Sequence, residues 1–188
     1  SFFDAHLAEF FDFYCERMLA LDAEPNRAHR ALAELEHDGT LRAVITQNID
    51  GLHQKAGSRN VLELHGSVLR NACMGCGAPY SVERLLDLRA ANPDGVPRCP
   101  ACGRIVKPEV VLYEEPLDER TLHEAITAIA QADLLVIAGT SLSVYPAAGL
   151  IDAFQGSRLV IVNRTPTPRD RHADLCIAAN VGDVLDFR

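Results

Sequence analysis

Hydrophobic residues follow a helical spacing in some segments of the chain and form short continuous runs in others, and this pattern predicts the secondary structure. Over residues 2–21, apolar side chains recur at every third or fourth position, which predicts an amphipathic helix. A second helix is expected to begin at the N-cap residue Asn26 and to end at Gly39. The expected helices cover residues 2–21, 26–39, 82–89, 118–131 and 146–154.

Short apolar runs rich in β-branched residues stand between these helices and predict strands. The expected strands cover residues 43–46, 61–64, 110–112, 134–138, 159–162 and 175–178, and the run 134–138 gives the clearest signal of a buried strand. Because strands alternate with helices, the sequence predicts an α/β fold in three layers, with a mostly parallel sheet and helices on both faces. Residues 67–108 break the pattern and are expected to form a small excursion from that sheet.

Composition and charge narrow the range of partners. Of the 188 residues, 48% are hydrophobic and 23% are charged, as in a soluble globular protein. The net charge is −8, which argues against a nucleic-acid backbone or an anionic membrane as the main partner. The longest apolar runs are far shorter than a membrane span, and no signal peptide opens the chain. We therefore expect a cytoplasmic protein that binds neither a membrane nor, directly, a nucleic acid.

Four of the six cysteines form two C-x-x-C pairs that are separated by 22 residues. This spacing is typical of a tetrahedral zinc site, because each tight turn supplies two thiolates. The expected ligands are Cys73, Cys76, Cys99 and Cys102. Four cysteines close the coordination shell, so the metal is expected to be structural. The alternative is a set of two redox-active pairs.

Polar residues follow the strand expected at 43–46. Gln47, Asn48 and Asp50 lie close together there, where ligands bind in open α/β sheets. Their amide and carboxylate groups suit ribose hydroxyls or a carboxamide. The alternative is that Asn48 and Asp50 only cap a turn into a short helix.

Two further polar groups follow the next strands: Gly139, Thr140 and Ser141 after one, and Asn163, Arg164 and Thr165 after the other. Several polar strand ends in one sheet form a rim that suits a nucleotide. The chain nevertheless contains neither a G-x-G-x-x-G motif nor a phosphate-binding P-loop. His65 follows the strand at 61–64, where a neutral imidazole can serve as a general base. The alternative for His65 is a histidine that a backbone carbonyl holds at a turn.

Together these motifs resemble the sirtuin family. The resemblance is carried, in unbroken order, by 46–53 (TQNIDGLH), 63–66 (ELHG), the cysteine quartet, 139–142 (GTSL) and 162–163 (VN). It implies a Rossmann-like NAD-binding catalytic domain over residues 1–66 and 109–188, and a small zinc-ribbon module over residues 67–108. It also implies an NAD-dependent protein-lysine deacylase of the transferase class.

The resemblance further implies the reaction and its components. Acyl groups, acetyl first among them, would be removed from protein lysines to give nicotinamide and O-acyl-ADP-ribose. NAD would be the co-substrate, one structural Zn²⁺ would be held per chain, and acyl-lysine proteins or peptides would be the partners.

Site residues follow by matching positions, and the catalytic ones are His65, as the base, and Asn48. The resemblance assigns cofactor binding to Gln47, Asn48, Ile49, Asp50, Gly139, Thr140, Ser141, Asn163, Arg164 and Thr165. It assigns substrate binding to Val111, Tyr113, Glu114, Ser143 and Val144. The peptide is expected to add as a strand between residues 113–116 and 143–145.

Two departures from the family pattern modify these expectations. Where the family has F-G-E, this chain has Tyr113, Glu114 and Glu115, and the charged Glu114 is expected to alter peptide preference. The glycine-rich N-terminal segment and the D-F-R loop of the family are not found, so the chain as given is expected to bind NAD poorly and to be inactive. The alternative functions are a protein mono-ADP-ribosyltransferase and a non-catalytic zinc-ribbon interaction module.

Overall fold

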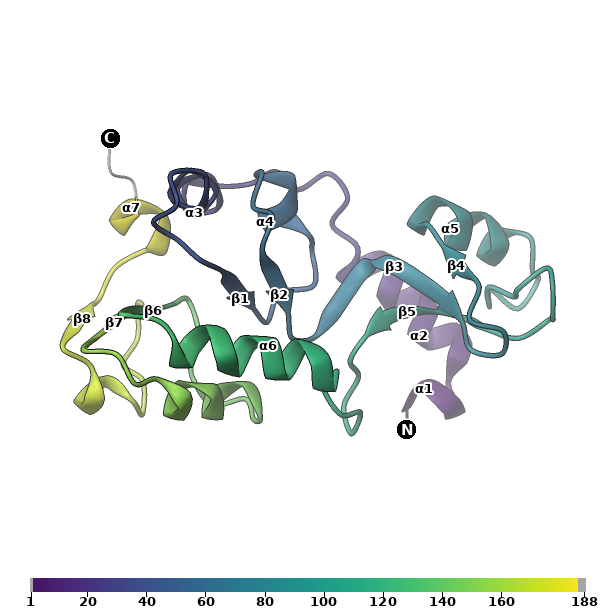
Figure 1. Cartoon of the computed structure of the whole chain (residues 1–188). Helices are drawn as coiled ribbons and strands as arrows, with labels where there is room; N and C mark the ends of the chain where they lie inside the picture. Colours follow the sequence, from purple (N-terminus) through teal and green to yellow (C-terminus); the bar gives the residue numbers. More distant parts are fainter. Residues whose placement is uncertain (1, 186–188) are drawn as a thin grey trace. The chain divides into compact units, whose positions relative to one another are not determined.

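In the computed structural model, which describes residues 2–185, the chain forms two structural units that are described separately. The first unit comprises Ser1–Ala23, Asn48–Gly51 and His65–Leu117. The second unit comprises Glu24–Gln47, Leu52–Leu64 and Asp118–Arg188. The labels of the helices and strands are shown in Figure 1.

The N-terminal segment of the first unit is helical, but it is not one helix. It contains α1 (Phe2–Ala5), α2 (Leu7–Phe13) and a π-helical turn, η1 (Tyr14–Met18). The predicted continuous helix over 2–21 is therefore wrong in two respects. His6 interrupts it with a φ of −138°, and the helical backbone ends at Met18.

Aromatic rings explain why the apolar spacing continues across this break. Phe10 packs edge-on against Phe3 at 4.8 Å between ring centroids and against Phe11 at 5.3 Å. The Tyr14 hydroxyl donates a hydrogen bond of 2.9 Å to the carbonyl of Val68, which joins the helices to the sheet of the same unit. The aromatic contacts, and not helix continuity, preserve the periodicity.

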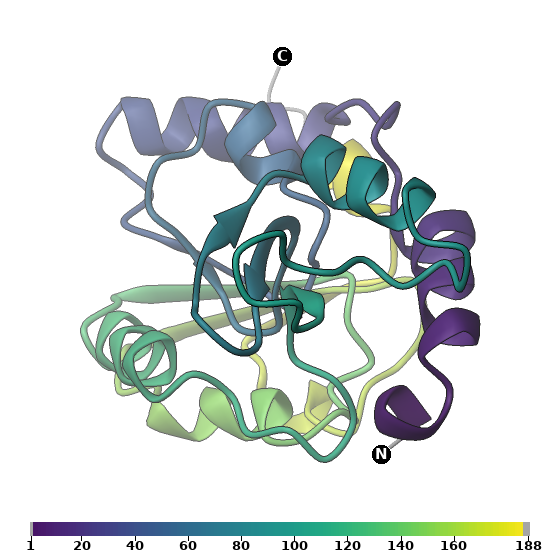
Figure 2. The same ribbon diagram turned by 90° about the vertical axis from the view of Figure 1, so that its right-hand side faces the viewer.

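The sheet of the first unit is antiparallel and has the strand order β4-β3-β5. Its strands are β3 (Gly66–Cys73), β4 (Pro79–Tyr80) and β5 (Val106–Val110), and α5 (Val82–Ala90) contacts β3 (Figures 1 and 2). The sequence predicted α5 but not β3 or β4, and it placed a strand at 110–112, of which only Val110 lies in β5. Strand β3 escaped notice because Ser67 and Asn71, each 1% exposed, put polar residues at buried positions.

The second unit contains two parallel sheets. One pairs β1 (Val44–Thr46) with β2 (Val61–Glu63). The other has the order β6-β7-β8, formed by β6 (Leu134–Ala138), β7 (Arg158–Val162) and β8 (Leu175–Ile177). The predicted α/β class with parallel strands is confirmed, with strand bounds within a residue or two of those expected.

Helices lie on both faces of these strands in Figure 1, with α3, α4 and α7 on one side and α6 and η2 on the other. The helical segments of the unit are α3 (Arg27–His37), α4 (Leu52–Lys55), α6 (Glu119–Ala130), η2 (Ala147–Ala153), η3 (Asp170–His172) and α7 (Val181–Val184). Asn26 caps α3, as predicted, through a reciprocal pair of hydrogen bonds with His29. The expected helix at 146–154 is present as the 3₁₀ segment η2.

One strand prediction requires correction. The run Leu134–Ala138 forms a strand, but Leu134 is 50% exposed and Val136 is 43% exposed. Within residues 2–185, β6 pairs only with β7, so it is an edge strand and its side chains are less covered than its apolar sequence predicts. No helix in this part of the chain is both long and apolar enough to cross a membrane.

Candidate functional site

The two C-x-x-C segments of the first unit fold as matching tight turns. The N–H of Gly77 donates to the carbonyl of Cys73 at 2.9 Å, and the N–H of Gly103 donates to that of Cys99 at 2.8 Å. Gly77 and Gly103 have φ values of +70° and +73°, which favour glycine. Each turn therefore directs two neighbouring thiols to one side of the backbone.

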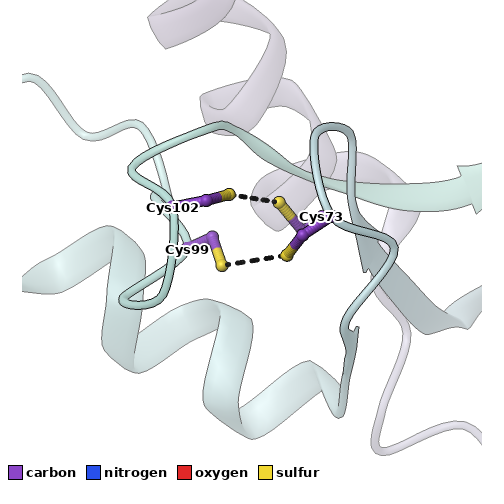
Figure 3. A group of neighbouring side chains, drawn as sticks. Cys73, Cys99 and Cys102 are labelled. Atoms are coloured by element: carbon purple, nitrogen blue, oxygen red, sulfur yellow. Dashed lines mark hydrogen bonds between the residues drawn. The ribbon is translucent and has the colours of Figure 1, made fainter.

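The four cysteine sulfurs converge on one point. All four lie within 4.8 Å of one another, and Figure 3 shows the Sγ atoms of Cys73, Cys99 and Cys102 pointing inward. The Sγ atoms of Cys73 and Cys102 are 3.3 Å apart, and those of Cys76 and Cys99 are 3.7 Å apart. Zinc–sulfur bonds of about 2.3 Å place the corners of a tetrahedron roughly 3.8 Å apart. The residues therefore fit one zinc ion with a closed shell of thiolates.

Hydrogen bonds at the sulfurs of Cys73 and Cys99 favour the thiolate form that zinc requires, whereas side-chain hydrogen bonds with the neighbouring thiols raise the pKa of Cys102 to about 12. The Tyr80 hydroxyl lies 3.0 Å from the Sγ of Cys99, and this hydrogen bond lowers the pKa of Cys99 to about 6. The same hydrogen bond raises the pKa of Tyr80 to about 12, and because a thiolate at Cys99 can only accept, the hydroxyl is the donor in that form. The backbone N–H of Cys76 likewise lowers the pKa of Cys73. Sequence reasoning missed Tyr80, because no motif marks it.

In the second unit, parallel pairing brings two of the predicted polar strand ends to the same edge. The N–H of Gly139, just after β6, donates to the carbonyl of Val162 at 3.0 Å. The N–H of Asn163, just after β7, donates to Ile177 at 3.1 Å. Gly139 and Asn163 are therefore adjacent at the carboxyl edge, where open α/β sheets bind ligands.

The loop after β6 is folded tightly at this edge. The Gln47 side chain, which follows β1, lies with its Nε2 atom 3.4 Å from the Oγ1 atom of Thr140. The same oxygen accepts a hydrogen bond of 3.2 Å from the N–H of Leu142. The hydroxyls of Ser141 and Ser143 are hydrogen-bonded to each other. The second unit thus brings the predicted residues Gln47, Thr140 and Ser141 to one edge.

Beyond β7, the side chain of Asn163 donates to the carbonyl of Thr165 at 2.9 Å. Arg164 and Thr165 are exposed there. This turn leaves a guanidinium and a hydroxyl available to anionic or hydroxyl groups of a ligand. The third predicted group of polar residues is therefore ordered and accessible.

His65 and the segment 48–51 belong to the first unit. The carbonyl of Ile49 accepts a hydrogen bond of 3.0 Å from Val68, and the carbonyl of His65 accepts one of 3.0 Å from Val111. His65, which is half-buried, is thereby held next to Val111, a residue predicted to contact the substrate.

Gly66 fixes the backbone directly after His65. Its φ is +75°, and a Cβ atom at this position would lie 1.9 Å from the carbonyl oxygen of Glu109. Only glycine permits this close approach of β3 to β5. The last residue of the ELHG sequence must therefore be glycine.

The predicted substrate segment contains a strained turn. The N–H of Glu115 donates to the carbonyl of Leu112 at 3.0 Å, and the Glu115 carboxylate accepts from the Leu112 N–H at 2.8 Å and from Lys107 at 3.2 Å. Glu114 occupies the third turn position with a φ of +75°, as in a type II turn that favours glycine. Tyr113 beside it is 97% exposed.

The predicted site residues are divided between the units. The first unit holds Asn48, Ile49, Asp50, His65, Val111, Tyr113 and Glu114, and the second holds Gln47, Gly139, Thr140, Ser141, Ser143, Val144, Asn163, Arg164 and Thr165.

Comparison with known proteins identifies the class. Residues 2–146 match the Sir2 family, so the chain belongs to this family. The resemblance to sirtuins that the sequence motifs indicated is therefore confirmed.

Relatives and solved structures agree with this assignment. The NAD-dependent protein deacetylase of Clostridium perfringens is 54% identical over 186 residues, covering 98% of this chain and 74% of the relative. That of Clostridium acetobutylicum is 50% identical, covering 99% of this chain and 74% of the relative. A structure of Sir2 with a p53 peptide and NAD⁺ superimposes with a TM-score of 0.93 at 42% identity, covering 98% of this chain and 77% of that one. A structure of Sir2Tm bound to a propionylated peptide superimposes with a TM-score of 0.93 at 42% identity, covering 98% of this chain and 78% of that one. The predicted Rossmann-like fold is confirmed.

Proposed function

We propose that the chain carries the catalytic machinery of an NAD-dependent protein deacylase that removes acetyl groups from lysine side chains. The observation that carries this proposal is the match to curated deacetylases and to Sir2 bound to peptide and NAD⁺ over at least 98% of this chain. Acyl-lysine, NAD and one water molecule would give deacylated lysine, nicotinamide and O-acyl-ADP-ribose.

NAD, as the co-substrate, supplies the bond between nicotinamide and ribose, whose cleavage drives transfer of the acyl group. His65 acts as the general base that accepts a proton from a ribose hydroxyl. Its position supports this role, because its backbone carbonyl accepts a hydrogen bond from the N–H of Val111 and Gly66 fixes the backbone that follows it. Asn48 orients the nicotinamide ribose, and Ile49 and Asp50 contact the nicotinamide carboxamide. The Ile49 carbonyl accepts a hydrogen bond from Val68 of β3, which holds this segment in place.

The carboxyl edge of the second unit binds the adenosine half of NAD. The adjacent strand ends at Gly139 and Asn163 support this assignment, as do the side chains of Thr140 and Ser141. Backbone N–H groups and hydroxyls in such a loop suit phosphate and ribose oxygens. Arg164 adds a positive charge at the same edge.

In the first unit, residues 113–116 are proposed to pair with the acylated peptide as a strand, with Val111 as a further substrate contact. In the second unit, Ser143 and Val144 are proposed as substrate contacts. The Glu115 carboxylate is already engaged by Lys107 and by its own turn, whereas Glu114 is exposed. We expect Glu114 to favour peptides with lysine or arginine next to the acylated residue. Exchange of Glu114 for Gln should weaken that preference without changing the turnover of a neutral peptide.

The test is a product analysis. The 188-residue chain, and a form extended before Ser1 by the glycine-rich segment of the family, are incubated with NAD and an acetyl-lysine peptide. With the extended form, mass spectrometry should find nicotinamide, O-acetyl-ADP-ribose and deacetylated peptide in equal amounts, whereas the 188-residue chain should give none of these products. An ADP-ribosylated peptide would favour the transferase alternative, and absence of both NAD and peptide binding would favour an interaction module.

We also propose where the protein is located and which class of partner it binds. A zinc site built from four thiols suits a reducing compartment, so we place the protein in the cytoplasm. The net charge of −8 supports a protein substrate over direct binding to nucleic acid.

A further inference from the structure

A tyrosine hydroxyl stands beside one of the four converging sulfurs. The Tyr80 oxygen lies 3.0 Å from the Sγ of Cys99, whose residue is only 2% exposed. We propose that Tyr80 is an outer-shell hydrogen-bond donor that retains zinc in the site by stabilising the thiolate of Cys99. The proposal concerns the metal centre alone and does not rest on the deacylase activity.

A network of hydrogen bonds fixes the backbone of Tyr80 and so positions its side chain. Strand pairing sets Tyr80 opposite Asn71, and the Asn71 side chain donates to the Tyr80 carbonyl at 3.4 Å. The other end of the same amide, its Oδ1 atom, accepts the longer branch, at 3.4 Å, of a hydrogen bond that the Tyr14 hydroxyl shares with the Val68 carbonyl. Asn71 and Tyr14 are 1% and 0% exposed. The backbone that carries Tyr80 is therefore anchored in the core of the first unit.

Electrostatics explains why such a donor matters. Four thiolates carry more negative charge than one Zn²⁺ cancels, and a buried anion without donors is costly. The backbone N–H of Gly75 donates to the Sγ of Cys73 at 3.3 Å. At Cys99, Tyr80 supplies a side-chain donor in addition to backbone hydrogen bonds from Ala101 and Cys102. Loss of outer-shell donors at metal sites typically lowers metal affinity by about 10- to 100-fold.

The experiment compares Tyr80→Phe with the wild-type chain, with Tyr113→Phe as the matched control. Tyr113 is 97% exposed and lies outside both C-x-x-C turns, so its hydroxyl should be irrelevant to the metal. Zinc transfer to a chromogenic chelator is followed at neutral pH with the 188-residue chain. Tyr80→Phe should weaken zinc binding by about 10- to 100-fold, while Tyr113→Phe behaves as wild type.

A second readout separates the hydrogen bond from general loosening. With saturating Co²⁺ in place of zinc, the thiolate-to-metal charge-transfer band reports the electron density on the sulfurs. Tyr80→Phe should shift this band relative to both wild type and Tyr113→Phe, with the far-ultraviolet circular dichroism unchanged. Wild-type zinc transfer and an unshifted cobalt band in Tyr80→Phe would overturn the proposal.

Discussion

The cysteine centre and the carboxyl edge of the parallel strands differ in how the chain assembles them. The four cysteines come from two local turns with glycines at positive φ, and Cys73 and Cys99 are buried. The edge collects residues from strands far apart in sequence, and its members Ser141, Arg164 and Thr165 are exposed. The first is built to enclose an ion, and the second remains accessible to a ligand.

The two regions also differ in the free energy that their interactions contribute to folding. Structural zinc contributes about 10–16 kcal/mol of apparent binding free energy in zinc-finger peptides, and this energy is coupled to folding. A neutral hydrogen bond such as that between Gln47 and Thr140 contributes only about 0.5–1.5 kcal/mol. The metal centre should therefore dominate stability, whereas the edge should dominate activity.

The largest effect is expected from breaking the metal centre. Cys99→Ser removes a buried ligand, so zinc content should fall from about one equivalent to near zero and the cooperative unfolding of β3, β4 and β5 should be lost. Elemental analysis and thermal unfolding provide the measurement. Cys176→Ser, at an exposed cysteine in β8, is the control and should keep its zinc. Retention of metal and stability by Cys99→Ser would contradict a four-cysteine site.

The next effect tests the backbone after His65. Gly66→Ala should lower the free energy of unfolding by about 2–5 kcal/mol, because strain at positive φ adds to a clash with the Glu109 carbonyl. Gly39→Ala is matched to it, with a φ of +76° but nothing within 4 Å of the added Cβ atom. It should cost only about 1–2 kcal/mol. Equal losses in urea denaturation would show that the close approach to β5 is unimportant.

Removal of the proposed base separates catalysis from metal binding. In the extended form, His65→Ala should lower deacylation by at least about 10²-fold, the range for a positioned general base. Zinc content should not change, since four cysteines already complete the shell. Steady-state kinetics and elemental analysis on one preparation check both statements. Near-wild-type turnover would contradict the assignment of His65 as the general base and would favour the alternative, a histidine held at a turn.

The smallest effect concerns the strained turn at residues 112–115. Glu114→Gly should raise the free energy of unfolding by about 1 kcal/mol, because glycine relieves the cost of a φ of +75° but gains entropy in the unfolded chain. Glu114→Ala keeps the strain and should give no such gain. A loss of stability in Glu114→Gly would mean that contacts of the Glu114 side chain outweigh the backbone strain.

The sequence predicts those features that depend on neighbouring residues. Asn26 and Asp118 lie at helix starts because a cap needs only the N–H groups of the following turn. The two cysteines of each pair lie together because each turn spans only a few residues, whereas the two turns meet through the pairing of β3 with β5. The strand-end residues Gly139 and Asn163 could be named because parallel strands end at a common edge.

Features that depend on distant residues could not be predicted. Strand β3 was missed because Ser67 and Asn71 are buried, and Asn71 is satisfied by partners elsewhere in the chain. The exposure of Leu134 depends on which strands pair with β6. The position of His65 beside Val111 follows from antiparallel pairing of β3 with β5, which periodicity does not reveal.

The most direct test of the contrast between the two regions is a metal exchange. Cd²⁺ also takes tetrahedral thiolate coordination, so it can replace zinc in the extended form without changing the fold. If the metal is structural and His65 with the strand edge carries the chemistry, kcat for an acetylated peptide should be the same with either metal. A kcat that changes with the metal, while circular dichroism and peptide binding stay the same, would contradict the account.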